Sequence, residues 1–183
     1  MLENGKPELL VPASSLEVLK VAVMYGADAV YIGGEMYGLR AKAKNFSMED
    51  MAEGIRFAHE HGKRVFVTAN ITAHNRDLEG VRKYFRELHK IGPDALIISD
   101  PGVFTIAREV CPEIEVHIST QSNNVNYETY IFSGRDLVPN EWFRRGNCPL
   151  KKLQRFGLIF RMTWRLKHLY MERCVFPTPV VAF

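Results

Sequence analysis

Short apolar runs and amphipathic segments alternate along the first two thirds of the chain. Runs rich in β-branched residues predict buried strands over residues 8–13, 29–32, 64–69, 95–99 and 115–119. Apolar positions at helical spacing predict helices over residues 16–25, 47–61, 77–91 and 102–110, with a fifth helix starting near Asn124. Serines before the first two helices can cap them, and Gly26 and Gly62 can end them. This order predicts an α/β fold with a parallel sheet.

Parallel β/α units close in two common ways, as an open doubly wound sheet or as a barrel. In a dinucleotide-binding doubly wound fold, a glycine-rich turn follows the first strand. Here Pro12-Ala13-Ser14-Ser15 stands at that place, which disfavours a dinucleotide site. In either closure, polar residues just beyond the strand ends gather on one face, where ligands bind.

Seven polar residues near the predicted strand ends form the candidate substrate site: Arg40, Asn45, Asn70, Asp100, Ser119, Thr120 and Gln121. Arg40 can clamp a carboxylate or phosphate, and Asn70 and Gln121 can exchange hydrogen bonds with a polar ligand. Asp100 precedes Pro101-Gly102, so it either contacts a ligand or caps the fourth helix. The stretch from Ser119 to Gln121 either lines a pocket or forms a hydrogen-bonded rim.

No metal or nucleophile motif stands out. His59-Glu60-His61 lacks the second histidine, four residues on, that zinc proteases use, and the end of a helix is a favourable place for histidine. Cys111 stands alone at a predicted helix end, which is typical of a structural thiol. We therefore expect no metal site in this chain, and spacing alone assigns no catalytic residue.

Charge and composition change abruptly near residue 132. Residues 1–132 hold 14 Lys and Arg against 18 Asp and Glu, a net charge of −4. Residues 133–183 hold 10 Lys and Arg against 3 Asp and Glu, a net charge of +7, and contain both tryptophans. Such a basic tail, rich in Trp and Arg, is either a nucleic-acid-binding arm or a sequence that was never selected to fold.

The location of the protein is expected to be cytoplasmic. Its three cysteines are widely spaced and odd in number, which fits a reducing compartment better than a disulfide framework. The first residues lack the pattern of a signal peptide, and no run of eighteen apolar residues occurs. We expect no membrane span.

Five linked motifs carry a resemblance to a known family. They begin at Glu8 (ELLVPASSLE), Tyr25 (YGADAVYIGG), Leu39 (LRAKAKNFS), Ser99 (SDPGV) and His117 (HISTQS). In this order they resemble the collagenase-like peptidases, peptidase family U-32, and the match covers nearly all of residues 6–132. The resemblance implies an incomplete TIM-like (β/α) barrel of about five β/α units, followed by a C-terminal tail that does not look native.

The resemblance also implies two competing activities. The family is labelled peptidase without a settled catalytic type, whereas several members take part in hydroxylating tRNA uridine or ribosomal RNA cytidine. Those members, and relatives in a quinone pathway, are thought to hold an iron–sulfur cluster through cysteines after the fifth unit. Their characteristic segment, His-Gly-Ala-Met-Cys followed by Ser-Tyr-Ser-Gly-Arg-Cys, is absent here, so no cofactor is expected in this chain.

The missing segment is legible in a neighbouring reading frame. Plausible codons for residues 167–183, read from one base earlier, encode Glu-Ala-Phe-Val-His-Gly-Ala-Met-Cys-Val-Ser-Tyr-Ser-Gly-Arg-Cys-Phe. The same shift turns residues 140–143 into Arg-Val-Val-Ser, part of a sixth strand. We therefore interpret residues 1–132 as the N-terminal half of a barrel and residues 133–183 as an out-of-frame tail, poorly ordered or irregular. On this interpretation Cys148 and Cys174 are not cluster ligands.

Three functional hypotheses follow. The leading one is a fragment of a family U-32 peptidase that is inactive as it stands; five of eight units would leave strands one and five without neighbours and lower the solubility. The second is a fragment of an RNA-modification enzyme that promotes tRNA uridine 5-hydroxylation. The third is a basic tail that binds RNA. Protein and tRNA thus remain alternative substrates, and the oligomeric state is open.

The frame hypothesis predicts a single-base difference in the gene near the codon for Phe132. Sequencing across the codons for Tyr130 to Arg135, beside an unshifted homologous gene, should show one base fewer in this gene. Equal base counts would exclude a shift, and the tail would then be a genuine coding sequence.

Overall fold

The computed structural model of the chain describes residues 8–37, 45–124, 126, 128 and 129, and two short strands further on. The strands are β1 (Leu10–Pro12), β2 (Ala29–Gly33), β3 (Arg64–Ala69), β4 (Ala95–Ile98), β5 (Glu115–Ile118), β6 (Glu141–Phe143) and β7 (Arg165–Lys167). The helices are α1 (Leu16–Met24), α2 (Met48–Glu60), α3 (Leu78–Ile91) and α4 (Pro101–Val110), with short 3-10 turns η1 (Asn75–Asp77) and η2 (Thr120–Ser122). The five strands and four helices predicted up to residue 119 are therefore present at their predicted places. The fifth helix expected near Asn124 falls largely outside the described residues.

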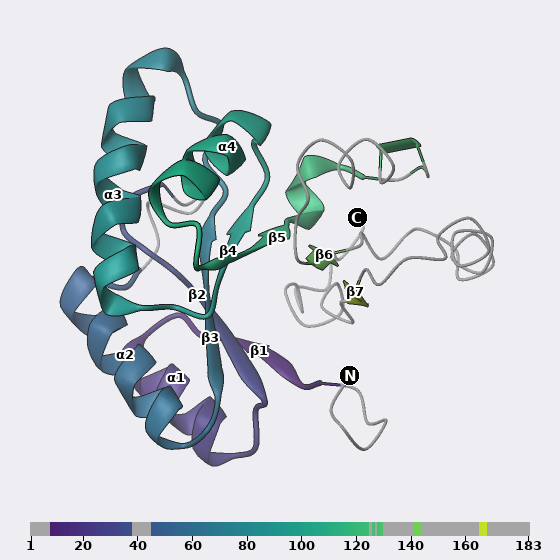
Figure 1. Cartoon of the computed structure of the whole chain (residues 1–183). Coiled ribbons are helices and arrows are strands. Elements are labelled where there is room, and N and C mark those ends of the chain that lie inside the picture. Colours follow the sequence, from purple (N-terminus) through teal and green to yellow (C-terminus); the bar gives the residue numbers. More distant parts are fainter. Residues whose placement is uncertain are drawn as a thin grey trace, which may run out of the picture.

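The order of the strands identifies the type of sheet. All the described strands pair in parallel, and their spatial order from β1 to β7 is their order along the chain. Helices α1 to α4 lie along one side of this sheet (Figure 1). A doubly wound sheet reverses its strand order and carries helices on both faces, whereas this winding is that of a (β/α) barrel. The predicted TIM-like α/β class is confirmed.

Strand β5 has a neighbour on each side, so the prediction that it would be an edge strand was wrong. That prediction assumed that the sheet ends after five units. Instead β6 pairs with β5, with His117 opposite Glu141, and β7 pairs with β6. Strand β6 lies where the neighbouring reading frame also predicts a sixth strand. Within the described part of the chain, the strands with a single neighbour are β1, beside β2, and β7, beside β6.

Alternate residues of each strand face opposite sides of the sheet. One set packs with the helices in the main core: Val30, Ile32, Val65, Val67, Ala69, Leu96, Ile98, Val116 and Ile118. The other set forms a separate cluster on the inner side: Leu10, Ala29, Tyr31, Phe66, Ala95 and Ile97. Burial on both faces explains why the strand sequences lack strict alternation. Each fully buried large side chain, such as Leu96, stabilises the fold by about 1.5–3 kcal/mol.

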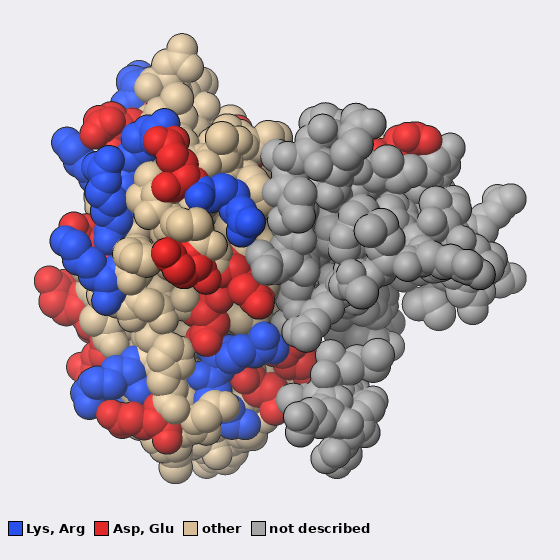
Figure 2. Space-filling model, in the orientation of Figure 1, with Lys and Arg blue, Asp and Glu red and all other residues tan. Residues whose placement is uncertain are grey.

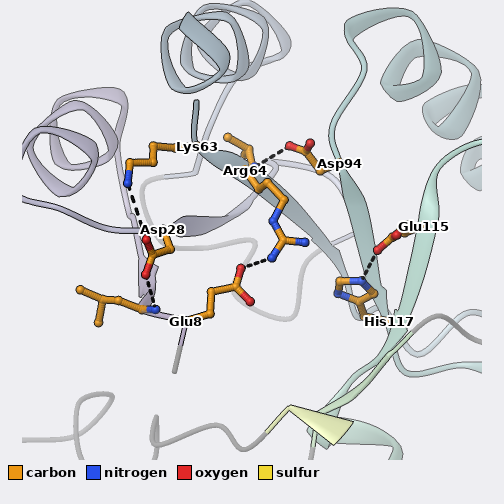
Figure 3. A network of polar contacts seen from close by, with 9 residues as sticks. Glu8, Asp28, Lys63, Arg64, Asp94, Glu115 and His117 are labelled. Carbon is orange, nitrogen blue, oxygen red and sulfur yellow. Dashed lines mark hydrogen bonds and ion pairs between the residues drawn. The ribbon is translucent and has the colours of Figure 1, made fainter. Parts of the chain in front are cut away.

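Two aspartates link neighbouring strands at the amino-terminal rim of the sheet. Asp28, just before β2, accepts a hydrogen bond of 2.9 Å from the amide of Leu9, just before β1, and its other oxygen lies 3.6 Å from Nζ of Lys63. Asp94, just before β4, accepts one of 2.7 Å from the amide of Val65 in β3, and Nε2 of His59 lies 2.9 Å from the same oxygen. Figure 3 shows both carboxylates beside the strand starts. Because each carboxylate bonds to the backbone of the preceding strand segment, it helps to fix the register.

One further ion pair and two contacts with the Phe66 ring lie at the same rim and on the inner face. Arg64 pairs with Glu8, and its guanidinium lies over the ring of Phe66, 5.3 Å from the centroid. Phe66 in turn meets His117 of β5 edge to face, with centroids 4.9 Å apart. In barrels of this kind the amino-terminal end serves stability, and the opposite end carries the ligand site.

Replacing Asp94 by alanine should destabilise the chain by about 1–3 kcal/mol, because the buried amide of Val65 loses its acceptor. The midpoint of urea unfolding, followed by circular dichroism, measures the change. Asp94→Asn keeps an accepting oxygen and should cost less. Glu87→Ala, which removes an exposed pair with Lys90, should change stability by less than about 0.5 kcal/mol. A similar loss in Asp94→Ala and Glu87→Ala would contradict the proposed role in strand register.

Candidate functional site

The carboxyl ends of β2 to β5 are set level with one another by the register. Gly33 lies opposite Thr68, Thr68 opposite Ile97, and Ile97 opposite His117. Two residues further along, on the same inner side, come Asn70, Ser99 and Ser119. The amide of Ser119 still donates to the carbonyl of Ile98, so the pairing continues to this level. By this register the three polar positions are level with one another, and together they are here called the mouth, at the end of the barrel where ligands bind.

Asn70 brings a buried hydrogen-bond acceptor to the mouth. Its side-chain oxygen is inaccessible to solvent and has no hydrogen-bond partner among the described residues. A buried acceptor left in this state costs about 1–3 kcal/mol. A ligand that reaches this oxygen and donates a hydrogen bond to it would remove that cost; the ligand-binding role of Asn70 stays a prediction.

Asn45 lies next to the mouth on the β2 side. Phe46 forms a β-bridge with Gly34, and its amide donates to the carbonyl of Gly33 over 3.0 Å. Asn45 is thereby held above the end of β2, with its side-chain oxygen 3.8 Å from where a Cβ of Gly33 would stand. Thr68 braces the same point, since its hydroxyl donates to the carbonyl of Ile32.

Ser119 closes a tight turn at the end of β5. It is 3% exposed, its Oγ accepts from the amide of Gln121 over 3.2 Å, and its carbonyl accepts from the hydroxyl of Ser122 over 2.7 Å. Thr120 is half-buried within this 3-10 turn, and Gln121 is exposed. The structure therefore supports the rim alternative for the stretch as a whole, with Ser119 facing the inner side.

Asp100 caps a helix. Its Oδ1 accepts from the amide of Val103 over 2.8 Å, and its backbone is extended, as an N-cap requires. Asp100 comes one residue after Ser99, so the alternation of side chains turns it toward the helices and away from the mouth. Of the two roles predicted for Asp100, the capping role is the one that the structure shows.

Arg40 lies outside the described residues, which leave off at Tyr37 and resume at Asn45. Tyr37 itself is unusual: its φ of 60° is in the left-handed region, which costs a bulky residue about 1–3 kcal/mol. Its ring lies 5.3 Å from that of Tyr84 in α3. Burial, together with the negative charge of Asp77, raises the pKa of the Tyr37 hydroxyl.

Three residues were not among the predicted site residues: Ser99 at the mouth, His117 on the inner face of β5, and Tyr37 beside α3. His117 is 0% exposed, and its Nε2 lies 3.2 Å from a carboxylate oxygen of Glu115, as Figure 3 shows. Counting back two residues from Ser119, or on two from Ile97, would have placed His117 and Ser99 on the inner side. No local pattern singles out Tyr37.

The described residues do not provide the thiolates that an iron–sulfur cluster needs. Cys111 is buried at the end of α4, on the helix side of the sheet, and its thiol donates to the carbonyl of Ala107. Burial raises the pKa of this thiol to about 11, against ionisation. No group of three His, Cys, Asp or Glu side chains that could hold a metal occurs in the part of the chain that the structure describes. His59 instead pairs with Asp94.

The outer surface of the helices carries interspersed charges of both signs. Figure 2 shows blue and red side chains side by side over the described region. Several are paired directly, including Lys20 with Glu53, Arg56 with Glu60 and Arg82 with Glu109. The face shown in Figure 2 therefore lacks a continuous basic patch over the described residues.

None of the described helices has the length and apolarity needed to cross a bilayer.

Comparisons with known proteins show which family this chain resembles in sequence and in fold. The model of peptidase family U32 matches residues 14–136. A tRNA hydroxylation protein P1 of Bacillus subtilis is 47% identical over 127 residues, 69% of this chain and 30% of that protein. A 23S rRNA 5-hydroxycytidine C2501 synthase of Escherichia coli is 43% identical over 120 residues, 66% of this chain and 18% of that protein. A U32 peptidase of known structure superposes with a TM-score of 0.72 at 13% identity, covering 88% of this chain and 67% of that one. The chain thus spans less than a third of these curated relatives.

The capping role of Asp100 predicts a graded loss of stability. Asp100→Ala should destabilise the chain by about 1 kcal/mol, because the first turn of α4 loses its acceptor. Asp100→Asn keeps an oxygen at the cap and should change stability much less. Thermal unfolding of the two variants measures the difference, and an equal loss in both would mean that the negative charge, rather than the cap, is what the fold needs.

Proposed function

Because the chain belongs to peptidase family U32, we propose that its barrel portion derives from a protein that hydroxylates a pyrimidine base in RNA. The observation that carries this proposal is the 47% and 43% identity to two relatives named for RNA hydroxylation, over the residues that build the mouth. The chain itself spans less than a third of the length of each of these two relatives. We propose that it is inactive in this form.

The chemistry of the mouth suits a nucleobase. Asn70 in the mouth and Asn45 beside it offer amides, which can both donate and accept, and Ser99 and Ser119 offer hydroxyls. A pyrimidine presents donors and acceptors on one edge, and proteins recognise unpaired RNA bases through such edges. The unmet acceptor of Asn70 fits the N3–H group of uridine. In the sequence, Arg40, Lys42 and Lys44 come shortly before Asn45, and such cations are suited to phosphate.

A proteolytic site finds less support at the mouth. Ser119 is the buried hydroxyl there, and its described contacts are with the backbone of Gln121 and with Ser122. A serine nucleophile needs a base within hydrogen-bond reach. The similarity to a solved U32 peptidase, at 13% identity, supports the fold alone.

We also propose that residues beyond about 132 are out of frame. The family match ends at residue 136, close to the point where the net charge changes sign. A tRNA hydroxylation protein P of Haemophilus influenzae matches over 72% of this chain. On this proposal the basic character of the tail comes from the genetic code, and an RNA-binding tail is the alternative.

Restoring the frame should restore function. In bacteria lacking their own tRNA hydroxylation proteins, the repaired gene should return 5-hydroxylated uridine to tRNA, measured by mass spectrometry, whereas the present gene should not. Asn70→Ala in the repaired protein should lower the modified fraction about tenfold or more, because the base loses its partner. Asn75→Ala, at an exposed position five residues further on in the turn η1, serves as the control. Absence of modification together with gelatin cleavage by the repaired protein would favour peptidase activity instead.

A further inference from the structure

We propose that Tyr37 and Tyr84 are positioning residues for the mouth. We also propose that the absence of a side chain at Gly80 of α3 leaves a notch, the space that the Tyr37 hydroxyl occupies. This inference rests on the proposed function, since the site it braces is the base site of Asn45 and Asn70. Tyr37 precedes the segment that leads to Asn45, and Tyr84 projects from α3 toward the end of β2. Neither residue lies among the polar groups of the mouth itself.

Gly80 makes room for Tyr37. A Cβ built on Gly80 would stand 1.9 Å from the Tyr37 hydroxyl oxygen and 3.2 Å from its Cζ. The first distance is far below any real contact, so a side chain at position 80 displaces the tyrosine. Glycine is also a poor residue within a helix, and α3 otherwise follows a regular amphipathic pattern. The space that Tyr37 needs therefore explains why a glycine stands at position 80 in this helix.

A second glycine makes room for Tyr84. A Cβ on Gly34 would stand 2.5 Å from the Tyr84 hydroxyl oxygen and 2.5 Å from Cε of Met51. Tyr84 is 3% exposed, and its hydroxyl has no hydrogen-bond partner among the described residues. The ring is thus held by shape, between Tyr37 on one side and the backbone at Gly34 on the other.

These contacts form a continuous path to Asn45. Tyr37 packs on Tyr84, Tyr84 packs against Gly34, and Gly34 bridges Phe46, the residue after Asn45. Phe46 is buried, and its carbonyl accepts from the amide of Glu35. The left-handed backbone of Tyr37 is a strained conformation that persists where the surroundings fix it, and such strain gathers at functional sites. The path braces the point where Asn45 stands above Gly33.

The test is a set of variants in the 183-residue chain, with affinity for a fluorescent twelve-nucleotide oligouridine RNA as the readout. Gly80→Ala and Tyr37→Ala should each weaken binding about fivefold, on the scale of one lost polar contact. The helical circular dichroism should be unchanged, since alanine favours the helix. The double variant Gly80→Ala with Tyr37→Phe removes the clashing oxygen and should return the affinity to within about twofold. Glu79→Ala, exposed on the same helix, is the control.

The outcomes separate this inference from the function on which it rests. All variants share the same tail, so differences between them report the mouth. If Asn70→Ala and Asn45→Ala leave the affinity unchanged, the base site itself is wrong. If those two weaken binding but Gly80→Ala and Tyr37→Ala do not, the tyrosine brace is wrong. A loss in Gly80→Ala that Tyr37→Phe does not repair would also overturn it, because the steric notch predicts the repair.

Discussion

The register between parallel strands is the constraint on which the rest of this structure depends. Side chains alternate along a strand, so a slip of one residue would exchange every inner residue for an outer one. Two similar segments fix it, Gly26–Ala29 and Gly92–Ala95, each with an aspartate before an alanine that begins a strand. Each aspartate bonds to a backbone amide of the strand segment before it. The polar network at one end of the sheet thus determines which side chains reach the mouth at the other.

The same alternation explains which parts of the site were predictable. Strand and helix positions followed from apolar spacing, and the strand ends located the mouth, so Asn70 and Ser119 could be named from the sequence. Asp100 was ambiguous because proximity to a strand end says nothing about direction; its parity with Ser99 turns it outward, to cap α4. Counting in steps of two from Ile97 would have resolved this. The contact between Tyr37 and Gly80 joins residues far apart in sequence, and the one local sign of it was a glycine inside an amphipathic helix.

The seam near residue 132 was visible in the sequence because charge is a local property. The pairing of β5 with β6 was not visible in the sequence, because the strand order of a sheet depends on segments that meet only in the folded chain. Strand β6 extends the parallel sheet beyond the seam. Strand pairing uses backbone groups that every residue except proline offers. A sixth strand at this place is therefore compatible with either reading frame, whereas the match to the family, which depends on side chains, ends at residue 136.

The three residues of the mouth carry no charge, which limits how strongly they could hold RNA. Nucleic-acid affinity comes largely from cations that neutralise phosphates, whereas base contacts supply selectivity. Amides and hydroxyls at the mouth serve the second purpose, and several basic side chains on the described helices are engaged with carboxylates, as in the pairs of Lys20 and Arg82. On the proposed function, affinity must then depend on cations elsewhere, such as Arg40 and its neighbours, or on the larger part of the relatives that this chain does not span. This portion of the barrel would select a base that other parts of the intact protein bring to it.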